Sequence, residues 1–174
     1  MAALAGIRPG HRVLDPCCGA GTLLIEAALA HPGARCEGFD LSREAVATAR
    51  ANAAAAAAAP PLTVHRADAG RLPLPDGTAD RVLCNPPWGT QVHPGGLLAT
   101  APDRWWRELR RVLAPDGTAV LLLPDPTALT TALRHDLTPV HLCRVRLFGA
   151  QPYVVQLAPL PAARSRAGSA LIGP

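Results

Sequence analysis

Three of the acidic residues in the first half of the chain each follow a short, largely apolar segment. These are Asp15, Asp40 and Asp68, and the pair Gly19 and Gly21 comes soon after the first of them. Glycine lets a backbone loop approach a ligand closely, while carboxylates accept hydrogen bonds from hydroxyl groups and attract cations. In this order, the residues predict a site for a ligand that carries both a ribose and positive charge.

The glycine loop differs from two common nucleotide-binding loops. The phosphate loop of nucleoside triphosphatases ends in Gly-Lys-Ser/Thr, but the chain has no lysine, since all 17 of its basic residues are arginine. The dinucleotide pattern GxGxxG is broken by Leu24 at its third glycine position, and Asp15 would repel a pyrophosphate beside the helix N-terminus. S-adenosylmethionine carries an ammonium, a sulfonium and no phosphate, so the same acid suits it. We therefore expect S-adenosylmethionine as the cofactor.

The expected cofactor contacts are divided among the three acids. Asp15 suits the cationic amino-acid end, and Asp40 can bind both ribose hydroxyls at the next strand end. Asp68 can accept a hydrogen bond from the adenine amino group or position its neighbours for that contact. Glycine pairs are also typical of tight turns and strand-end acids also cap helices, but the ordered set favours a cofactor site. The full expected set is Asp15, Cys18, Gly19, Gly21, Thr22, Asp40, Leu41, Asp68, Ala69 and Asn85.

A second candidate motif is the sequence Asn85-Pro86-Pro87-Trp88. The asparagine oxygen and a following backbone carbonyl can accept hydrogen bonds from an exocyclic NH2 group, which holds that nitrogen in line with a methyl donor. The two prolines stiffen the turn, and Trp88 can stack on a flipped-out base. Alone, such a sequence is equally typical of a simple turn. Behind a methyl-donor site it predicts methyl transfer to an amine, with these four residues as the catalytic set.

Both motifs fall between segments that alternate between strand and helix patterns. Short apolar runs that end in an acid or an asparagine predict buried strands, and longer runs of helix-forming residues predict helices. Such alternation is typical of a mostly parallel sheet with helices on both faces, in which ligands bind beyond the carboxyl ends of the strands. We expect strands at residues 12–16, 35–40, 62–66, 79–84, 118–123, 140–148 and 153–157, helices at 22–30, 43–58, 103–113 and 127–135, and a loop at 90–100.

Longer stretches around the two motifs resemble one protein family. The runs DPCCGAGTLLIEAAL (15–29), GFDLS (38–42) and LPLPDGTADRVLCNPPWG (72–89) resemble the catalytic domain of THUMP-associated RNA guanine-N2 methyltransferases, over residues 3–125. The usual DPFCGSGT of that family reads DPCCGAGT here, with Cys17 in the aromatic position and Ala20 in place of serine. The acid, the cysteine, both glycines and the threonine of the family sequence are retained. The resemblance implies a Rossmann-like class I methyltransferase fold with a seven-stranded sheet. It also implies guanine in structured tRNA, or in rRNA, as the substrate.

The expected way of capturing RNA is less direct. The family places an RNA-capturing THUMP domain ahead of this fold, whereas the first expected strand begins soon after Met1, so we expect a separate RNA-binding partner or domain. Arg104, Arg107, Arg110 and Arg111 could contact phosphates from one helix face. That helix is more typical of an amphipathic element with tryptophans inward and arginines in solvent. Two alternatives stay open. The enzyme could methylate a protein glutamine or adenine, or the chain could be a binding module without turnover.

Length and composition limit the remaining classes. With 174 residues, the chain predicts one methyltransferase domain at 1–158 and a loose tail at 159–174, and its net charge of +4 permits a polyanionic partner. No apolar stretch is long enough to span a bilayer, and the N-terminus does not read as a secretory signal. The five cysteines favour core packing over disulfides or a metal site, since their spacing fits no zinc motif. We therefore expect a cytoplasmic protein that uses no metal and no membrane.

Overall fold

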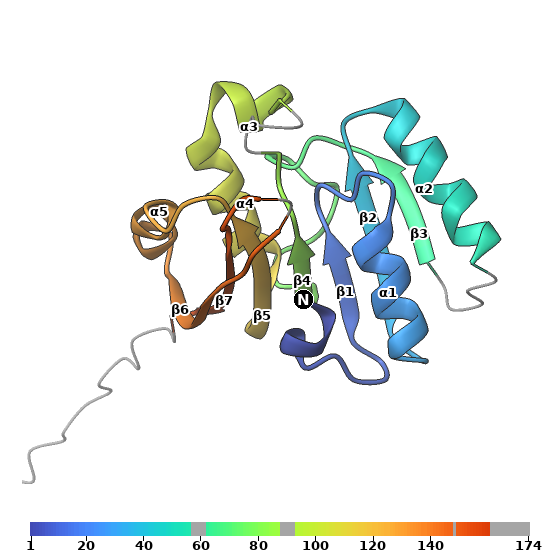
Figure 1. The fold of residues 1–174 in the computed structure, drawn as a ribbon, viewed down its shortest axis with the longest axis horizontal. Coiled ribbons are helices and arrows are strands. Elements are labelled where there is room, and N and C mark those ends of the chain that lie inside the picture. Colours follow the sequence, from blue (N-terminus) through green and yellow to red (C-terminus); the bar gives the residue numbers. More distant parts are fainter. Residues whose placement is uncertain (57–61, 88–92, 148, 161–174) are drawn as a thin grey trace, which may run out of the picture.

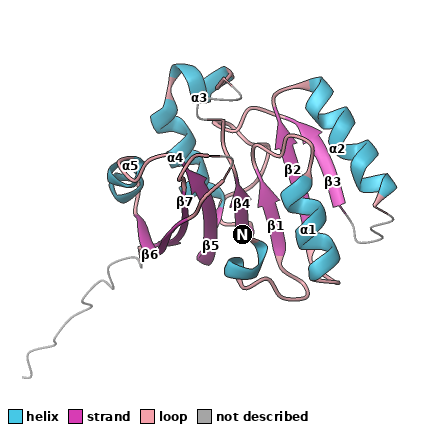
Figure 2. Cartoon of the chain, viewed as in Figure 1, coloured by secondary structure: helices cyan, strands magenta, loops and turns pink. Residues whose placement is uncertain are grey.

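The computed structural model describes residues 1–56, 62–87, 93–147 and 149–160. Within them the chain forms one twisted sheet with helices packed against it (Figure 1, Figure 2). The strands lie in the order β3-β2-β1-β4-β5-β7-β6. Their bounds are β1 (Arg12–Asp15), β2 (Arg35–Asp40), β3 (Leu62–Arg66), β4 (Ala79–Cys84), β5 (Leu113–Leu123), β6 (Leu137–Arg144) and β7 (Tyr153–Pro159).

The sheet is parallel except at one strand. β1 pairs in parallel with β2 and β4, as β2 does with β3 and β4 with β5. β7 runs antiparallel to both of its neighbours, β5 and β6. The expected mostly parallel seven-stranded sheet is therefore confirmed. Its order puts β4, which precedes Asn85, beside β1, which ends at Asp15, so the two candidate motifs share one edge of the sheet.

Helices cover both faces of the sheet, and each face has its own apolar core. Val13 and Leu83 belong to one core and Leu14 and Val82 to the other, because successive residues of a strand point to opposite faces. The first core is covered by η1 (Ala2–Ala5), α1 (Thr22–Ala30) and α2 (Arg43–Ala55). The second is covered by α3 (Gly96–Thr100), α4 (Pro102–Val112) and α5 (Ala128–Arg134) (Figure 1).

Helix α2 begins at the expected capping residue and ends earlier than expected. The hydroxyl oxygen of Ser42 accepts a hydrogen bond from the Ala45 N–H at 3.2 Å, which satisfies one of the free donors of the first turn. The helix ends at Ala55 rather than near residue 58. Residues 57 and 58 of the alanine run lie outside the described part of the chain.

The junction between α4 and β5 differs from the prediction. The helix expected at 103–113 ends at Val112, and the strand expected at 118–123 already begins at Leu113. Leu113 is 1% exposed and pairs with Ala79 on β4, so its burial against the neighbouring strand extends the sheet. The Pro-Asp-Gly sequence that follows it is typical of a turn, but it lies inside β5, where the pairing with β4 changes register.

The last two strands also differ from their predicted bounds, although β7 begins at Tyr153 as predicted. β6 begins and ends earlier than the strand predicted at 140–148, whose residue 148 lies outside the described residues. β7 continues to Pro159, one residue past the expected domain end at 158. Leu160, the next residue, still donates its N–H to the Asp136 carbonyl at 2.8 Å. Of the expected tail, residues 161–174 are outside the described part of the chain.

Helix α4 buries its tryptophans and has one arginine bound within the fold. Trp105 and Trp106 are 1% and 4% exposed, which confirms the inward orientation expected for them. Arg111 donates to both carboxylate oxygens of Glu108, at 2.8 and 2.6 Å, and to Oδ1 of Asp76 at 2.6 Å. This network joins α4 to the connection between β3 and β4, so Arg111 serves the fold rather than a phosphate.

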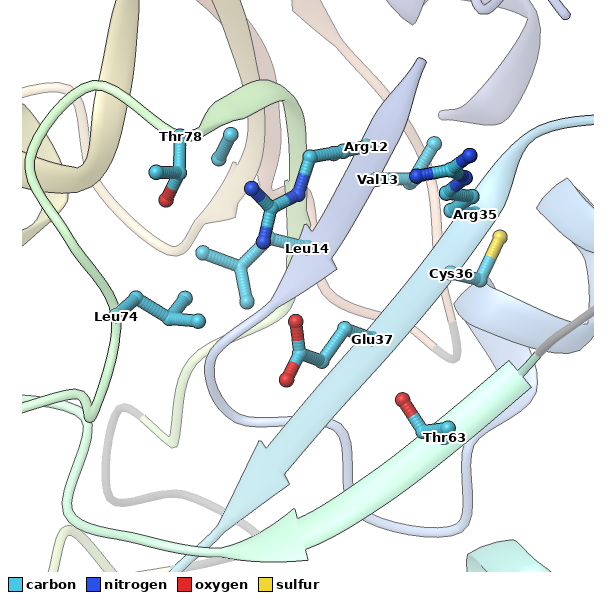
Figure 3. Close-up of a pocket in the computed structure, with 10 residues that line it drawn as sticks. Arg12, Val13, Leu14, Arg35, Cys36, Glu37, Thr63, Leu74 and Thr78 are labelled. Carbon is cyan, nitrogen blue, oxygen red and sulfur yellow. The ribbon is translucent and has the colours of Figure 1, made fainter. Parts of the chain in front are cut away.

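One face of β1–β3 has no helix over it in the described part of the chain. The connection between β3 and β4, residues 67–78, contains no helix, and its Leu72 and Leu74 pack against the face opposite α1 and α2. A cavity of about 470 Å³ lies there, with Glu37 and Thr63 on its β2 and β3 sides (Figure 3). Arg12 and Arg35, the first residues of β1 and β2, also line it. The cavity therefore lies at the end of these strands opposite the two motifs.

Candidate active site

A second cavity, of about 800 Å³, lies at the carboxyl ends of β1, β2 and β4. Its size is within the range of pockets that enclose a small organic ligand. Nearly all residues predicted to bind the cofactor or the amine line this cavity. Gly21 does not line it, and Trp88 is outside the described residues. Those that line it are Asp15, Cys18, Gly19, Thr22, Asp40, Leu41, Asp68, Ala69, Asn85, Pro86 and Pro87.

The loop between β1 and α1 is closed by backbone hydrogen bonds. The Gly21 N–H donates to the Cys18 carbonyl at 2.8 Å, and the Cys18 N–H donates to the Phe39 carbonyl at 2.9 Å, which ties the loop to β2. Gly19 and Gly21 have φ angles of 52° and 83°, a region that side chains disfavour. A Cβ added to Gly21 would lie 3.2 Å from Cβ of Ala49. Gly21 therefore shapes the turn and its contact with α2.

Asp15 is the buried acid of this site. The residue is 2% exposed, and its Oδ1 accepts a hydrogen bond from the Cys17 N–H at 3.1 Å. Burial raises the pKa of the Asp15 carboxyl to about 7, and the negative charge of Asp40 acts in the same direction, against a hydrogen bond with the Cys84 thiol. A cation in the cavity would stabilise the ionised carboxylate. Asp15 is therefore suited to a positively charged ligand group.

Asp40 joins the glycine loop to the start of α2. Its Oδ2 accepts a hydrogen bond from the Gly19 N–H and its Oδ1 accepts one from the Ser42 N–H, each at 2.9 Å. Each oxygen of a carboxylate can accept a second hydrogen bond. Asp40 thus fixes the backbone on two sides of the cavity and still has acceptor capacity for hydroxyl groups of a ligand.

Asp68 also accepts hydrogen bonds from two backbone groups. Its Oδ1 accepts from the Gly70 N–H and its Oδ2 from the Leu97 N–H, each at 2.9 Å. Gly70 belongs to the turn that follows β3, whereas Leu97 lies in α3. One carboxylate therefore connects two segments that border the cavity.

The turn after β4 brings an amide to the same cavity. Asn85 is exposed within it, and Pro86 beside it is buried. The parallel pairing of Val82 on β4 with Leu14 on β1 brings Asn85 to the edge where Asp15 ends its strand. An acceptor for an amine and a carboxylate for a cation therefore face one common space.

The charged side chains that line the cavity indicate which cofactor it fits. Among the described residues that line it, Asp15, Asp40 and Asp68 carry carboxylates and none is an arginine. A nucleotide phosphate would face three carboxylates and no guanidinium among these residues, whereas an ammonium and a sulfonium find negative charge, buried in the case of Asp15. Leu41 and Leu98 add apolar surface. These residues fit S-adenosylmethionine.

The described residues contain no group of three or more His, Cys, Asp or Glu side chains placed to hold a metal ion. None of the described helices is long and apolar enough to cross a membrane. The cysteines are all free. Cys18, Cys36 and Cys84 are buried, which confirms the prediction of core packing for them. The prediction is wrong for Cys143, which is exposed on β6. Cys17 is half-buried and lines the cavity.

Besides Leu122 and Pro124 at the end of β5, two walls of the cavity are missing from the predicted set. His93, Gly95 and Leu98 line it from the segment expected to be a loop, where α3 forms instead. Residues 147 and 150–152 line it from the connection between β6 and β7. The adjacent glycines at 95 and 96 were a possible signal for the first wall, because such pairs allow a close backbone approach. The second wall has no comparable signal.

The strand order of this sheet, with its single antiparallel strand, is that of the class I S-adenosylmethionine-dependent methyltransferases. The crystal structure of TrmN from Thermus thermophilus matches the chain with a TM-score of 0.71 and 32% identity, over 91% of this chain and 46% of that one. The UPF0020 family model, described as "RMKL-like, methyltransferase domain", matches residues 1–151. The chain belongs to this family.

Two relatives align over most of the chain. The tRNA (guanine(6)-N2)-methyltransferase of Thermus thermophilus is 36% identical over 162 residues, which are 90% of this chain and 47% of the relative. The U6 snRNA (guanine-N(2))-methyltransferase THUMPD2 of Bos taurus is 36% identical over 125 residues, 72% of this chain and 24% of the relative. The chain therefore spans about half the length of the first relative and a quarter of the second.

Proposed function

We propose that this chain is the catalytic part of an S-adenosylmethionine-dependent enzyme that methylates N2 of guanine in structured RNA, either tRNA or rRNA. The observation that carries the proposal is that Asp15 and Asn85 line one cavity, so a cation site and an amine acceptor are adjacent. The Thermus thermophilus tRNA methyltransferase and the Bos taurus U6 snRNA methyltransferase described above are both named as guanine-N2 methyltransferases, which supports guanine over other amines.

The residues of the site would divide the work between cofactor and amine. S-adenosylmethionine, when bound, supplies a methyl group activated by its positive sulfonium. Asp15 would hold its cationic end and Asp40 its ribose. The Asn85 oxygen and a following carbonyl would accept hydrogen bonds from the guanine NH2 group, which favours the positive charge that develops on nitrogen. Pro86 and Pro87 have no N–H to compete for these oxygens. The guanine nitrogen would gain the methyl group as the S–CH3 bond breaks, which leaves a neutral thioether, and it would release its proton to water.

We place the capture of RNA on a separate domain or partner. Arg111, one of the arginines of α4, is bound by Glu108 and Asp76. Arg107 of the same helix pairs with Asp103 at 3.5 Å. The net charge of +4 is small for a surface that must neutralise several phosphates. For a tRNA or rRNA substrate, we also propose the cytoplasm as the site of action.

Labelled S-adenosylmethionine identifies the substrate class. The protein is incubated with total RNA, total protein and DNA in parallel, and the methylated product is identified by mass spectrometry. We expect N2-methylguanosine in the RNA sample. Methyladenine or methylglutamine as the product would contradict guanine and support the corresponding alternative. Because RNA capture is assigned to a separate domain or partner, the RNA is supplied at high concentration. Cofactor binding without any product under that condition would indicate a binding module.

The ribose contact predicts a loss of affinity in Asp40→Ala. S-adenosylmethionine binding, measured by calorimetry, should weaken roughly 10- to 100-fold, because a hydrogen bond to a charged group contributes about 1.5–3 kcal/mol. Asp80→Ala is the matched control. Oδ2 of Asp80 also accepts a hydrogen bond from a backbone N–H, that of Arg12 at 2.7 Å, but at the opposite edge of the sheet. The affinity of Asp80→Ala for S-adenosylmethionine should therefore equal that of the wild type. Unchanged affinity in Asp40→Ala would refute the assignment.

A further inference from the structure

The residues that line the candidate cavity come from two halves of the sheet. The three acids of the site follow β1, β2 and β3. The start of α3 lies on their side, because a Cβ added to Gly95 would lie 3.1 Å from Cδ2 of Leu41. The other half, which we call the β4–β7 half, is formed by Asn85, Pro86, Pro87, Leu122, Pro124, Leu147, Ala150, Gln151 and Pro152. With the cofactor beside the acids, the β4–β7 half faces the substrate.

Strand pairing places Gln151 across this half from Asn85. Cys84 on β4 and Val155 on β7 pair with the same residue of β5, Leu121. Because β7 is antiparallel, the chain just before it lies beyond the same edge of the sheet as the chain just after β4. At a strand spacing of ~4.8 Å, β7 lies about 10 Å from β4. This separation leaves room for a planar ring between the two amide side chains.

Backbone hydrogen bonds hold the chain on both sides of Gln151. The Val145 N–H donates to the Pro152 carbonyl at 2.9 Å, which continues the ladder of β6 and β7. Leu147 and Ala150 exchange two backbone hydrogen bonds, at 3.0 and 2.9 Å. Gln151 is exposed and lines the cavity, and its side-chain amide makes no hydrogen bond to another described residue. A fixed backbone thus presents an amide that can bind a ligand.

The other side chains of the β4–β7 half suit the faces of a flat ring. Apart from Asn85 and Gln151, they are leucine, alanine and proline, which have no side-chain donor or acceptor. Enzymes that act on a flipped-out base contact its faces with apolar side chains and its polar edge with hydrogen bonds. The β4–β7 half offers both kinds of contact, with one amide on each side.

We propose that Gln151 is a specificity-determining residue that binds the ring edge of the target guanine. Beside its N2 amine, guanine carries the N1–H donor and then the O6 acceptor. The Gln151 amide offers an acceptor and a donor side by side, so its Oε1 accepts from N1–H while its Nε2 donates to O6. Asn85 holds the amine on the opposite side of the ring. The inference deepens the proposed function and rests on it for the identity of the base.

Gln151→Ala should lower kcat/KM for methylation of a short RNA with a single guanine roughly tenfold, because two hydrogen bonds to the base are lost. An RNA with 2-aminopurine in place of that guanine keeps the N2 amine but has neither the N1 hydrogen nor O6. On this RNA, the loss in Gln151→Ala should be less than about threefold, because two changes at one contact are not additive. S-adenosylmethionine affinity, measured by calorimetry, should stay at the wild-type value.

Gln156→Ala is the matched control. Gln156 belongs to β7 and does not line the cavity, so this variant should methylate both RNAs as the wild type does. Equal losses on the two RNAs in Gln151→Ala would show a purely structural role and overturn the proposal. A parallel loss of cofactor affinity would also overturn it, because Gln151 would then serve the cofactor.

A titration with guanosine in the presence of S-adenosylhomocysteine gives a readout without turnover. The NMR signal of the Gln151 side-chain NH2 group, assigned by its absence in Gln151→Ala, should shift as guanosine binds. An unmoved signal at saturating guanosine, beside guanine methylation by the wild type, would overturn this inference alone. A shifted signal without any methylated guanine would support the inference and contradict the proposed function.

Discussion

Replacing Asn85 by alanine should lower the rate of methyl transfer to RNA roughly 100- to 1,000-fold, the loss expected when one preorganised polar group is removed from the place where charge develops. Asn85 lines the cavity directly after β4, and alanine removes only its amide. Pro86 and Pro87 keep the turn in shape. S-adenosylmethionine affinity, measured by calorimetry, should change little because Asp15 and Asp40 remain. A methyl-transfer assay at saturating cofactor measures the rate.

Two further variants make this result specific. Asn85→Asp keeps an acceptor oxygen at the same position and should retain far more activity than Asn85→Ala. Asn52→Ala removes the other asparagine of the chain, whose Nδ2 donates to the Ala20 carbonyl at 3.0 Å. Asn52 does not line the cavity, so its loss should leave the rate close to that of the wild type. A fully active Asn85→Ala would show that the amine is held elsewhere.

The first half of the fold could be predicted because its signals are local. The strands expected at 35–40, 62–66 and 79–84 have those bounds in the structure. Each is a short run followed by an acid or an asparagine, and each is joined in parallel to its neighbour. Parallel strands in such a sheet have helices or connections on their faces and so read as apolar runs. The polar groups at the ends of these strands meet at one edge of the sheet, so most of the residues that line the cavity could be predicted.

The second half depends on pairing that the sequence does not display. β6 is an edge strand, and its apolar residues Val140 and Leu142 are 57% and 47% exposed. Those side chains suggested a strand from 140 onward, whereas pairing with β7 begins at Leu137, which is buried. Likewise, Leu113 joins β5 because Ala79 lies beside it. An exposed edge and a long-range partner both weaken the relation between local apolarity and strand limits.

The same distinction applies to the site. Asp15 and Asn85 lie at strand ends, so topology alone brings them together. The position of Leu97 against Asp68 depends instead on how the chain returns over the cavity between β4 and α4. Gly21 depends on packing in another way: its motif position predicts a cofactor contact, which stays a prediction, and the structure shows its role in the turn beside Ala49. Packing across distant segments decided both cases.

Asp15→Asn should weaken cofactor binding strongly and stabilise the free protein at alkaline pH. The amide keeps an oxygen for the Cys17 N–H, which Asp15 Oδ1 accepts at 3.1 Å, so the loop after β1 is preserved. It offers no negative charge to a cationic ligand. S-adenosylmethionine affinity should fall roughly 100-fold, because a hydrogen bond to a charged group contributes about 1.5–3 kcal/mol. Calorimetry at about pH 8 measures this loss.

The gain in stability follows from the pKa of the acid. Burial raises the pKa of Asp15 from its ordinary value of 3.8 to about 7, so the folded protein holds the proton more tightly than the unfolded chain does. The stabilising contribution of that proton is complete below about pH 4 and is lost as the pH rises through about 7. Above that pH the ionised carboxylate destabilises the fold by at most roughly 4 kcal/mol. The neutral amide avoids this cost.

The melting temperature of Asp15→Asn minus that of the wild type should therefore be larger at about pH 8 than at about pH 4. The affinity of the wild type for S-adenosylmethionine should rise as Asp15 ionises, whereas the affinity of the variant should not follow this titration. Asp116→Asn removes an exposed carboxylate of β5 and should change neither the melting temperature nor the affinity.

An equal difference in melting temperature at both pH values would contradict the buried charge. Wild-type affinity in Asp15→Asn would show that the cation binds elsewhere. If both results hold, the charge that destabilises the empty site is the same charge that binds the cofactor.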